Sequence, residues 1–125
     1  ESKQSARNFH NYKVWQDAVS FATMLYQVTD KLPWFEKRDF ATKCNGLSLA
    51  IVKIAEGAGR PTDTDFAHFV DIALGSSNEV ETQLIISRNL NYIDTTQFNS
   101  LIEKLSEIQK QLTGLIATIR KSSPR

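Results

Sequence analysis

The feature that most constrains the fold is the spacing of apolar residues in the last third of the chain. Apolar side chains recur there at steps of three and four, which places them on one face of a helix. They are Phe98, Leu101, Ile102, Leu105, Ile108, Leu112, Leu115, Ile116 and Ile119. Asp94 and Gln97 precede this stripe at the spacing of a capping box. The pattern predicts a helix over about 95–121 that buries one face against other helices.

Three earlier segments have the same periodicity, and glycines or prolines separate them. We expect helices over about 11–31, 36–58 and 62–91. Their stripes are Trp15, Ala18, Val19, Ala22, Leu25 and Tyr26; Phe40, Cys44, Leu47, Ile51, Ile54 and Ala58; and Phe66, Phe69, Val70, Ala73, Ser77, Val80 and Leu84. Short connections make neighbouring helices antiparallel. The sequence predicts an all-α protein, an antiparallel up-down four-helix bundle formed by residues 1–125 as a single domain, with residues 1–8 and 122–125 frayed.

Composition excludes several classes of protein. The 125 residues include 15 Lys and Arg against 14 Asp and Glu, for a formal net charge of +1. This balance excludes a strongly basic nucleic-acid binder but allows a local basic patch. No apolar run reaches the roughly 20 residues that span a membrane, and the single cysteine, Cys44, excludes an internal disulfide. We expect a cytoplasmic protein that does not enter a membrane.

The sequence offers little material for catalysis or cofactor binding. Of its two histidines, only His68 has an acid, Asp65, three residues before it, whereas a di-iron bundle needs two inward Glu-x-x-His pairs. Cys44 falls on the apolar stripe and is interpreted as a core residue, without a histidine near it in sequence. We therefore expect no enzyme, no catalytic residue, no metal and no cofactor.

Charge is uneven between the second and third helices. Residues 37–60, which include most of the second helix and the turn after it, carry five bases against Asp39 and Glu56. The bases are the candidate RNA contacts: Lys37, Arg38, Lys43, Lys53 and Arg60. The third helix carries five acids and no base up to Thr82: Asp63, Asp65, Asp71, Glu79 and Glu81. Such a split is typical of solvated faces, and it also allows unlike faces to meet between subunits. Arg60 either joins Glu56 in a helix-end charge network or points from an exposed turn toward an anionic partner.

Two segments depart from a simple helical pattern. Gly75, Ser76 and Ser77 lie in mid-helix, where we favour a close helix–helix crossing over a binding surface. Trp34 and Phe35 lie in the first connection, where we favour rings that cap the bundle over rings that stack on a base. The helices also contain more apolar residues than one buried stripe requires, as expected for an oligomer or for buried bundle helices. The additional apolar residues are Leu49, Val52, Ile72, Leu74 and Ile86.

Four stretches in order resemble the motifs of one family. Residues 54–60, IAEGAGR, are similar to its "IAEGxGR", and residues 12–18, YKVWQDA, to its opening "LxVWQxA". Residues 65–69 resemble "EFxxFL", and residues 72–84 resemble "IAxGSxxExxxQL". The family is that of the 23S rRNA intervening-sequence proteins, and the resemblance covers about residues 9–94. This sequence lacks the family's paired arginines in the second helix and its proline before "IAEG", which weakens an RNA interpretation because arginines are the better phosphate ligands.

The resemblance implies a helical bundle that assembles into a homo-oligomer, often a pentamer. It also implies structural or interface roles for the motif residues Trp15, Glu56, Gly57, Gly59, Gly75, Ser76, Glu79 and Gln83. Our first hypothesis is a non-enzymatic oligomer that binds RNA or a ribonucleoprotein through the basic second helix. The alternative is a protein–protein interaction scaffold with no nucleic-acid role, which the near-neutral charge favours.

Overall fold

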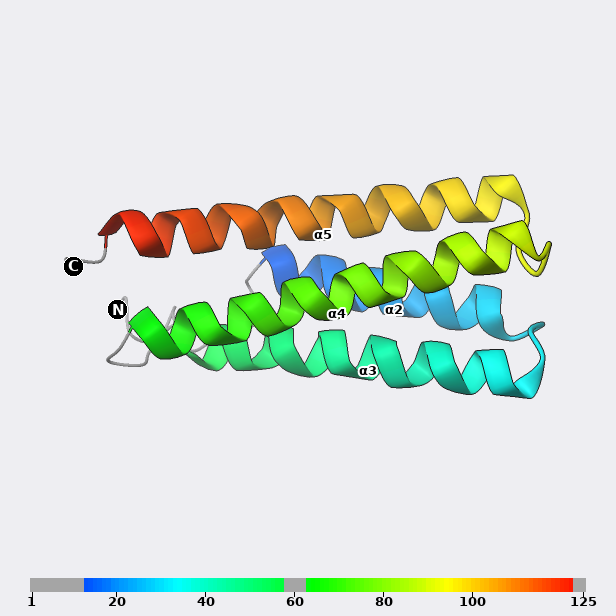
Figure 1. The fold of residues 1–125 in the computed structure, drawn as a ribbon, viewed down its shortest axis with the longest axis horizontal. Helices are drawn as coiled ribbons and strands as arrows, with labels where there is room; N and C mark the ends of the chain where they lie inside the picture. Colours follow the sequence, from blue (N-terminus) through cyan, green and yellow to red (C-terminus); the bar gives the residue numbers. More distant parts are fainter. Residues whose placement is uncertain (1–12, 58–62, 123–125) are drawn as a thin grey trace.

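A computed structural model of the chain describes residues 13–57 and 63–122, with the side chains of 13–52 and 67–118. These residues form the helices α2 (Lys13–Thr29), α3 (Trp34–Gly57), α4 (Asp63–Asn89) and α5 (Thr95–Ser122). The helices lie alongside one another, and the chain reverses direction from each helix to the next (Figure 1). No described residue belongs to a strand, so the predicted four-helix bundle is confirmed.

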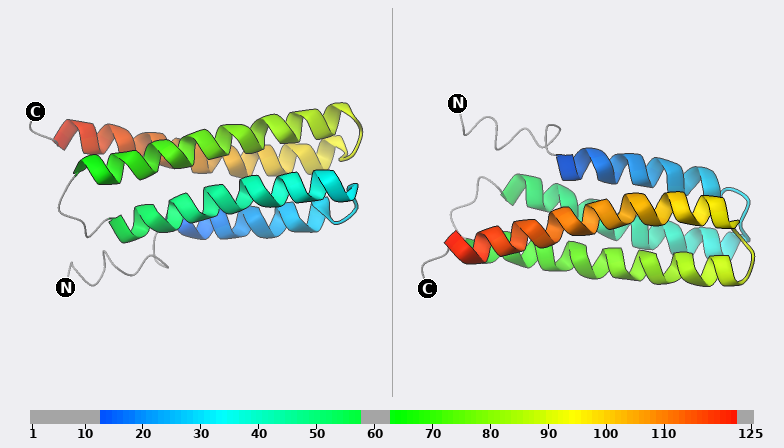
Figure 2. Two further views of the ribbon diagram at one scale, coloured as in Figure 1. Left: turned by 60° about the horizontal axis from the view of Figure 1, so that its bottom comes forward. Right: turned by 90° about the horizontal axis from the view of Figure 1, so that it is seen from above.

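Each helix packs against two others. The neighbouring pairs are α2 with α3, α3 with α4, α4 with α5, and α5 with α2, and the two views in Figure 2 show this arrangement. Among the described residues, the diagonal pairs α2–α4 and α3–α5 have no Cα atoms within 8 Å of each other. The helices therefore form a ring around one shared core, and each keeps an outer face.

All four helices contribute buried apolar side chains to the core. Four residues of the predicted stripes lie outside the described side chains: Ile54, Ala58, Phe66 and Ile119. The largest fully buried side chains of the core are Phe21, Leu25, Phe40, Leu47, Ile51, Val70, Leu84, Leu101, Leu105, Ile108 and Leu112. Cys44 is buried among them as predicted. Burial removes roughly 1.5–3 kcal/mol of unfavourable hydration for each large apolar side chain. This core is what holds the four helices in place.

The predicted stripe of α2 is partly wrong. Val19 and Tyr26 are largely exposed, while Val14 and Phe21 are buried beside Ala18 and Leu25. The buried set follows steps of four, three and four, which is the narrow seam of a helix packed in a bundle. Apolar residues of α2 also lie on either side of the buried seam, and their spacing alone does not show which of them another helix covers.

The first connection lies two residues earlier in the chain than the sequence predicts and has the same length. Helix α2 ends at Thr29 instead of about 31, because the Leu32 amide donates to the Thr29 carbonyl at 3.0 Å and closes a turn. Helix α3 begins at Trp34 instead of about 36, and the Lys37 amide donates to the Pro33 carbonyl at 3.0 Å. Trp34 and Phe35 therefore belong to the first turn of α3.

The second described connection joins α4 to α5 through two capping motifs. Asn91 has a left-handed backbone, with φ of 62°, and the Tyr92 amide donates to the Ser87 carbonyl at 2.9 Å. This Schellman motif ends α4 at Asn89, two residues before the predicted boundary. The capping box that precedes α5 is confirmed: the Gln97 amide donates to Asp94 Oδ1 at 2.7 Å, and Gln97 Oε1 accepts from the Asp94 amide at 3.1 Å.

Side-chain hydrogen bonds join neighbouring helices around the core. Tyr26 Oη donates to Asn45 Oδ1 between α2 and α3, at 3.1 Å. Gln111 Nε2 donates to Asp17 Oδ2 between α5 and α2, at 2.6 Å. Lys13 Nζ lies 2.8 Å from the same Asp17 oxygen. Polar contacts of this kind fix the rotation and register of helices that apolar packing alone would leave free to slide.

A second polar link joins α4 to α5. Gln109 Nε2 donates to Ser77 Oγ, Asn78 Oδ1 and Glu81 Oε1, each at 3.2 Å. The buried Ser77 hydroxyl also donates to the Leu74 carbonyl at 2.7 Å. Ser87 is also buried on α4, but unlike that of Ser77 its hydroxyl has no hydrogen-bond partner among the described residues.

The two buried serines of α4 give a matched stability test. Ser87→Ala removes an unsatisfied buried hydroxyl and should raise the free energy of unfolding by about 1 kcal/mol. Ser77→Ala removes a buried hydroxyl that donates to the Leu74 carbonyl and accepts from Gln109, and it should lower the free energy of unfolding by about 1 kcal/mol. Urea unfolding of the two variants and the parent chain measures both changes. Equal losses in the two variants would contradict the assignment of Ser87 as unsatisfied.

Asp17 gives a pH-dependence test. Burial raises the pKa of the Asp17 carboxyl, but hydrogen bonds from Lys13 and Gln111 and the charges of Lys13 and Lys104 outweigh it and leave the pKa below its usual value. The stabilisation is then complete above the unfolded pKa of about 4 and is lost as the pH falls through the lower folded value.

Asp17→Asn should therefore be less stable than the parent chain at about pH 7, and the difference should shrink at about pH 2. Urea unfolding at the two pH values tests this. Asp39→Asn is the control for the loss of one negative charge, since this exposed carboxyl lies on α3 outside the Asp17 cluster. A difference between Asp17→Asn and the parent that stays constant with pH would contradict the assignment.

Candidate interaction surfaces

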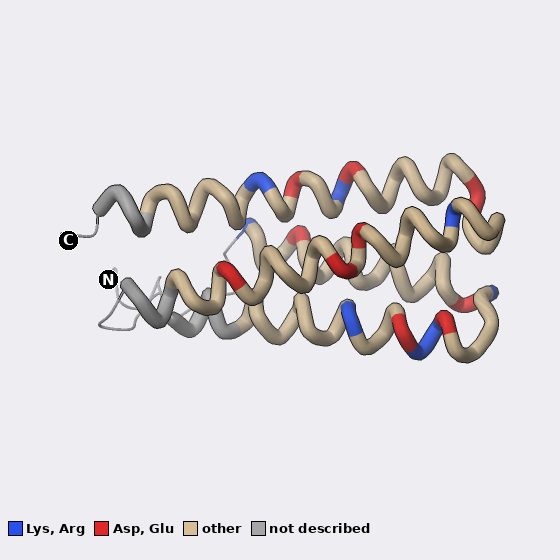
Figure 3. Tube along the Cα trace, in the orientation of Figure 1, with Lys and Arg blue, Asp and Glu red and all other residues tan. Residues whose placement is uncertain are grey.

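Two exposed cations lie in the first turns of α3, beside the α2–α3 connection. Lys37 Nζ is 3.3 Å from Asp30 Oδ1 in that connection. The Arg38 guanidinium carbon lies 4.9 Å from the centre of the Trp34 ring. Figure 3 shows basic positions near this end of α3, with acidic ones between and beside them. The cations are therefore at the surface and already held by local partners.

Lys43 lies on another side of α3. It follows Lys37 by six residues, which places it about 120° away around the helix axis, and it is half-buried. Lys53 and Arg60 lie outside the described side chains. Of the five predicted RNA contacts, the structure brings Lys37 and Arg38 to one end of the bundle and places Lys43 apart from them.

The charge split falls on two adjacent helices. The exposed acids Asp71 and Glu79 lie on α4, which packs directly against α3. Gln83 Nε2 on α4 donates to Glu36 Oε1 on α3 at 2.9 Å and so links the two helices. Because the acids of α4 are close to α3, they offset part of the positive potential of the α3 cations within the same chain.

Trp34 and Phe35 do not cap the end of the bundle, contrary to the favoured interpretation. Trp34 is 69% exposed and Phe35 is 44% exposed. Their ring centres are 5.9 Å apart in an edge-to-face arrangement. The bundle end is closed by Leu32, Ile93 and Phe98 instead, which are buried. Trp34 and Arg38 are four residues apart on one helix, a spacing from which their contact could have been predicted.

Gly75 does not lie at a close helix crossing, and this expectation is also wrong. Gly75 is exposed, and a Cβ atom placed on it would meet no atom within 4 Å. The next residue, Ser76, does lie at the α3–α4 contact, where a Cβ atom on Gly46 would be 3.7 Å from Ser76 Oγ, an ordinary packing distance. Gly75 is thus exposed helix surface, and a binding role for it stays a prediction.

An apolar groove runs between α3 and α4 beside this contact. Its volume is about 280 Å³. Its lining residues are Gly46, Leu49, Ala50, Phe69, Ile72 and Ser76. Leu49 is 61% exposed and Ile72 is 41% exposed, two of the positions that exceed what a single stripe needs. Phe69 and Gly46 were not recognised as surface residues from the sequence, because periodicity assigned Phe69 to the seam.

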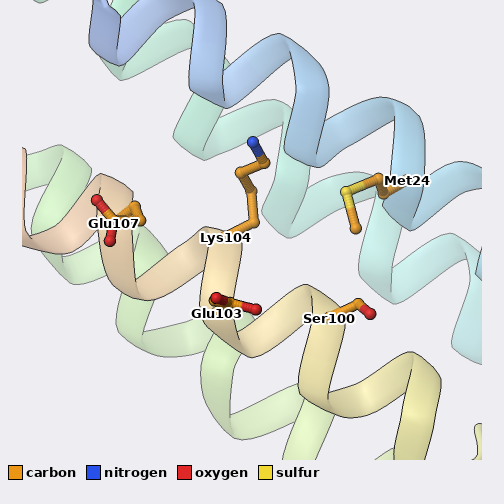
Figure 4. A pocket seen from close by; sticks show the side chains of 5 residues that line it. All are labelled: Met24, Ser100, Glu103, Lys104 and Glu107. Atoms are coloured by element: carbon orange, nitrogen blue, oxygen red, sulfur yellow. The ribbon is translucent and has the colours of Figure 1, made fainter.

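A second hollow lies between α2 and α5 and has a different character. It has a volume of about 320 Å³ and is lined by Met24, Ser100, Glu103, Lys104 and Glu107. Lys104 extends from α5 toward α2, while Glu103 and Glu107 lie along the α5 side (Figure 4). In residues 13–52 and 67–118, no group of three or more His, Cys, Asp or Glu side chains is placed to hold a metal ion.

Comparison with known proteins identifies the family of the chain. The family model for the 23S rRNA-intervening sequence protein matches residues 10–114. The chain belongs to this family. No curated protein sequence matches it. None of the helices in the described part of the chain is long and apolar enough to cross a membrane.

The remaining family-motif residues fall into three groups. Trp15 is half-buried and packs against the core from α2. Ser76 is half-buried at the α3–α4 contact, and Glu79 is exposed on α4. Gly57 is the last residue of α3, whereas the side chain of Glu56 and the whole of Gly59 lie outside the described residues. The family motifs thus concentrate on α3 and α4, the pair that forms the apolar groove.

Proposed function

We propose that this member of the 23S rRNA-intervening sequence protein family is a non-enzymatic, homo-oligomeric bundle that binds RNA or a ribonucleoprotein through α3. The observation that supports it most is the pair of exposed cations, Lys37 and Arg38, at one end of α3. A guanidinium binds a phosphate through paired hydrogen bonds, and an ammonium binds it as a point charge. The Lys37–Asp30 pair is exposed and weak, so the lysine can exchange its carboxylate for a phosphate.

Assembly would make a near-neutral chain an effective RNA ligand. Each copy offers only a few cations, and α4 adds nearby acids. Repeating the same end of α3 around a ring multiplies weak phosphate contacts through effective concentration, without any new contact in the single chain. The family resemblance leads us to expect five copies.

The RNA proposal predicts a loss of affinity and of salt dependence when Lys37 and Arg38 are both changed to Gln. Affinity for a structured rRNA fragment should fall about tenfold near 0.15 M salt, because two phosphate contacts are removed. The slope of log K against log salt should decrease by about 2 for each protomer that contacts the RNA. Titration of the nuclease-treated protein at several salt concentrations measures both.

A matched control removes the same charge elsewhere. Lys104→Gln with Lys110→Gln takes two cations from α5, away from the end of α3 that bears Lys37. The control should keep a steeper salt slope than the α3 variant. If both double variants retain the parent affinity and slope while folded, the assignment of Lys37 and Arg38 is wrong.

The apolar groove favours a second candidate function, a protein–protein interaction scaffold. An exposed groove of this kind is typical of an interface rather than of a free surface. We assign it to a second copy of the chain, because the helices that form it carry opposite charges, Lys43 on α3 and Asp71 and Glu79 on α4. Copies that meet at the groove can pair these charges across the interface.

The groove assignment is tested by two isoleucines of α4 with nearly equal exposure. Ile72, 41% exposed, lines the groove, whereas Ile86, 42% exposed, lies outside it. Ile72→Asp should convert the oligomer into monomers, because a buried unpaired carboxylate is costly, and Ile86→Asp should leave the assembly intact. Light scattering measures the mass. Dissociation by both variants, or by neither, would show that the groove is not the interface.

A further inference from the structure

The exposed Trp34 ring has the features of a stacking platform. It is 69% exposed, although a tryptophan side chain buries a large apolar area when it can. The Arg38 guanidinium lies over the ring, 4.9 Å from its centre. Phe35 also meets the ring edge-to-face, with the ring centres 5.9 Å apart, and the Trp34 side chain nevertheless keeps ring surface exposed for stacking. Nothing in the described core requires this residue, because it lies in the first turn of α3 and points outward.

The charges around Trp34 are arranged asymmetrically on the helix. Lys37 and Arg38 follow it by three and four residues, so both lie on its side of α3. Glu36 is turned toward α4 and accepts a hydrogen bond from Gln83, and Asp39 is five residues away on another side. The ring is therefore bordered by cations, although this end of the helix as a whole is close to neutral.

We propose that Trp34 stacks on an unpaired base of RNA, with Arg38 and Lys37 placed for the adjoining phosphates. Every base has a flat aromatic face, so an exposed ring beside cations suits single strands of varied sequence. Bases within a duplex are already stacked on one another and do not expose their faces. This inference rests on the proposed RNA-binding function and specifies the RNA as single-stranded where it meets α3.

A protein partner fits this place less well. Within residues 30–39, the exposed apolar side chains are Trp34 and Phe35, and the other exposed side chains are charged. A stable protein interface covers about 800 Å² on each partner and has an apolar centre. The α3–α4 groove is lined by apolar residues, whereas the two rings of the Trp34 site are bordered by charges.

Substitution of Trp34 by Phe and by Leu separates stacking from simple apolar contact. Both replacements are apolar and smaller than Trp, but only Phe keeps an aromatic face. With a single-stranded RNA of about 12 nucleotides, Trp34→Leu should weaken binding about tenfold and Trp34→Phe much less. A duplex of the same length should bind all three chains equally. Tryptophan fluorescence should be quenched on binding by the parent chain and not by Trp34→Phe, which retains Trp15.

The salt slope distinguishes failure of this inference from failure of the RNA function. Trp34→Leu should leave the slope of log K against log salt unchanged, since stacking releases no counterions. Equal losses in Trp34→Phe and Trp34→Leu without quenching would overturn stacking, and the RNA function would survive if the Lys37 and Arg38 double variant still lowers the slope. RNA binding that is unaffected by Trp34→Leu, with a reduced oligomer mass, would assign the ring to a protein contact. Failure of the parent chain to bind either RNA would overturn both.

Discussion

The shared apolar core determines everything else in this structure. Because each helix contacts its two neighbours and neither described diagonal pair meets, all four stripes converge on one interior. Leu47 and Ile51 of α3, Val80 of α4 and Leu105 of α5 are all fully buried there. No pair of these helices could hide its stripe alone, so the helices are stable only together. The outer faces of the helices do not contribute to this core, so their side chains can serve binding or assembly.

Polar contacts then fix the rotation of each helix about its axis. The Gln109 amide reaches three acceptors on α4, and Gln111 reaches Asp17 on α2, so α5 is held on both sides. The Gln83–Glu36 hydrogen bond holds α3 against α4 in the same way. With rotation fixed, the direction of every surface residue is fixed too. This is why Leu49 and Ile72 share one groove while Ile86, on the same helix as Ile72, does not.

The sequence predicted the four helices and most of the core because a period of 3.6 residues determines which side chains share a face. It assigned Gly75 to a close helix crossing, Trp34 to a cap on the bundle and Val19 to the buried stripe, and these assignments were wrong because the period does not show whether a neighbouring helix covers a face. A glycine in mid-helix suggests a close crossing, but a Cβ atom on Gly75 would meet no atom within 4 Å. Helix ends differed by about two residues where backbone geometry decided them, as at the left-handed Asn91. The six-residue spacing within the predicted helix did separate Lys37 from Lys43, so treating the five bases as one face overlooked a signal that the sequence contained.

The two candidate surfaces are far enough apart to act together. Leu49 follows Trp34 by 15 residues on the same helix, which corresponds to about 22 Å along its axis. A copy seated in the α3–α4 groove would therefore leave the Trp34 end of α3 uncovered. Closed symmetry would then present each Trp34 in an equivalent position around the assembly axis. The two proposals therefore do not compete for the same residues, because the groove is proposed for assembly and the Trp34 ring for RNA binding.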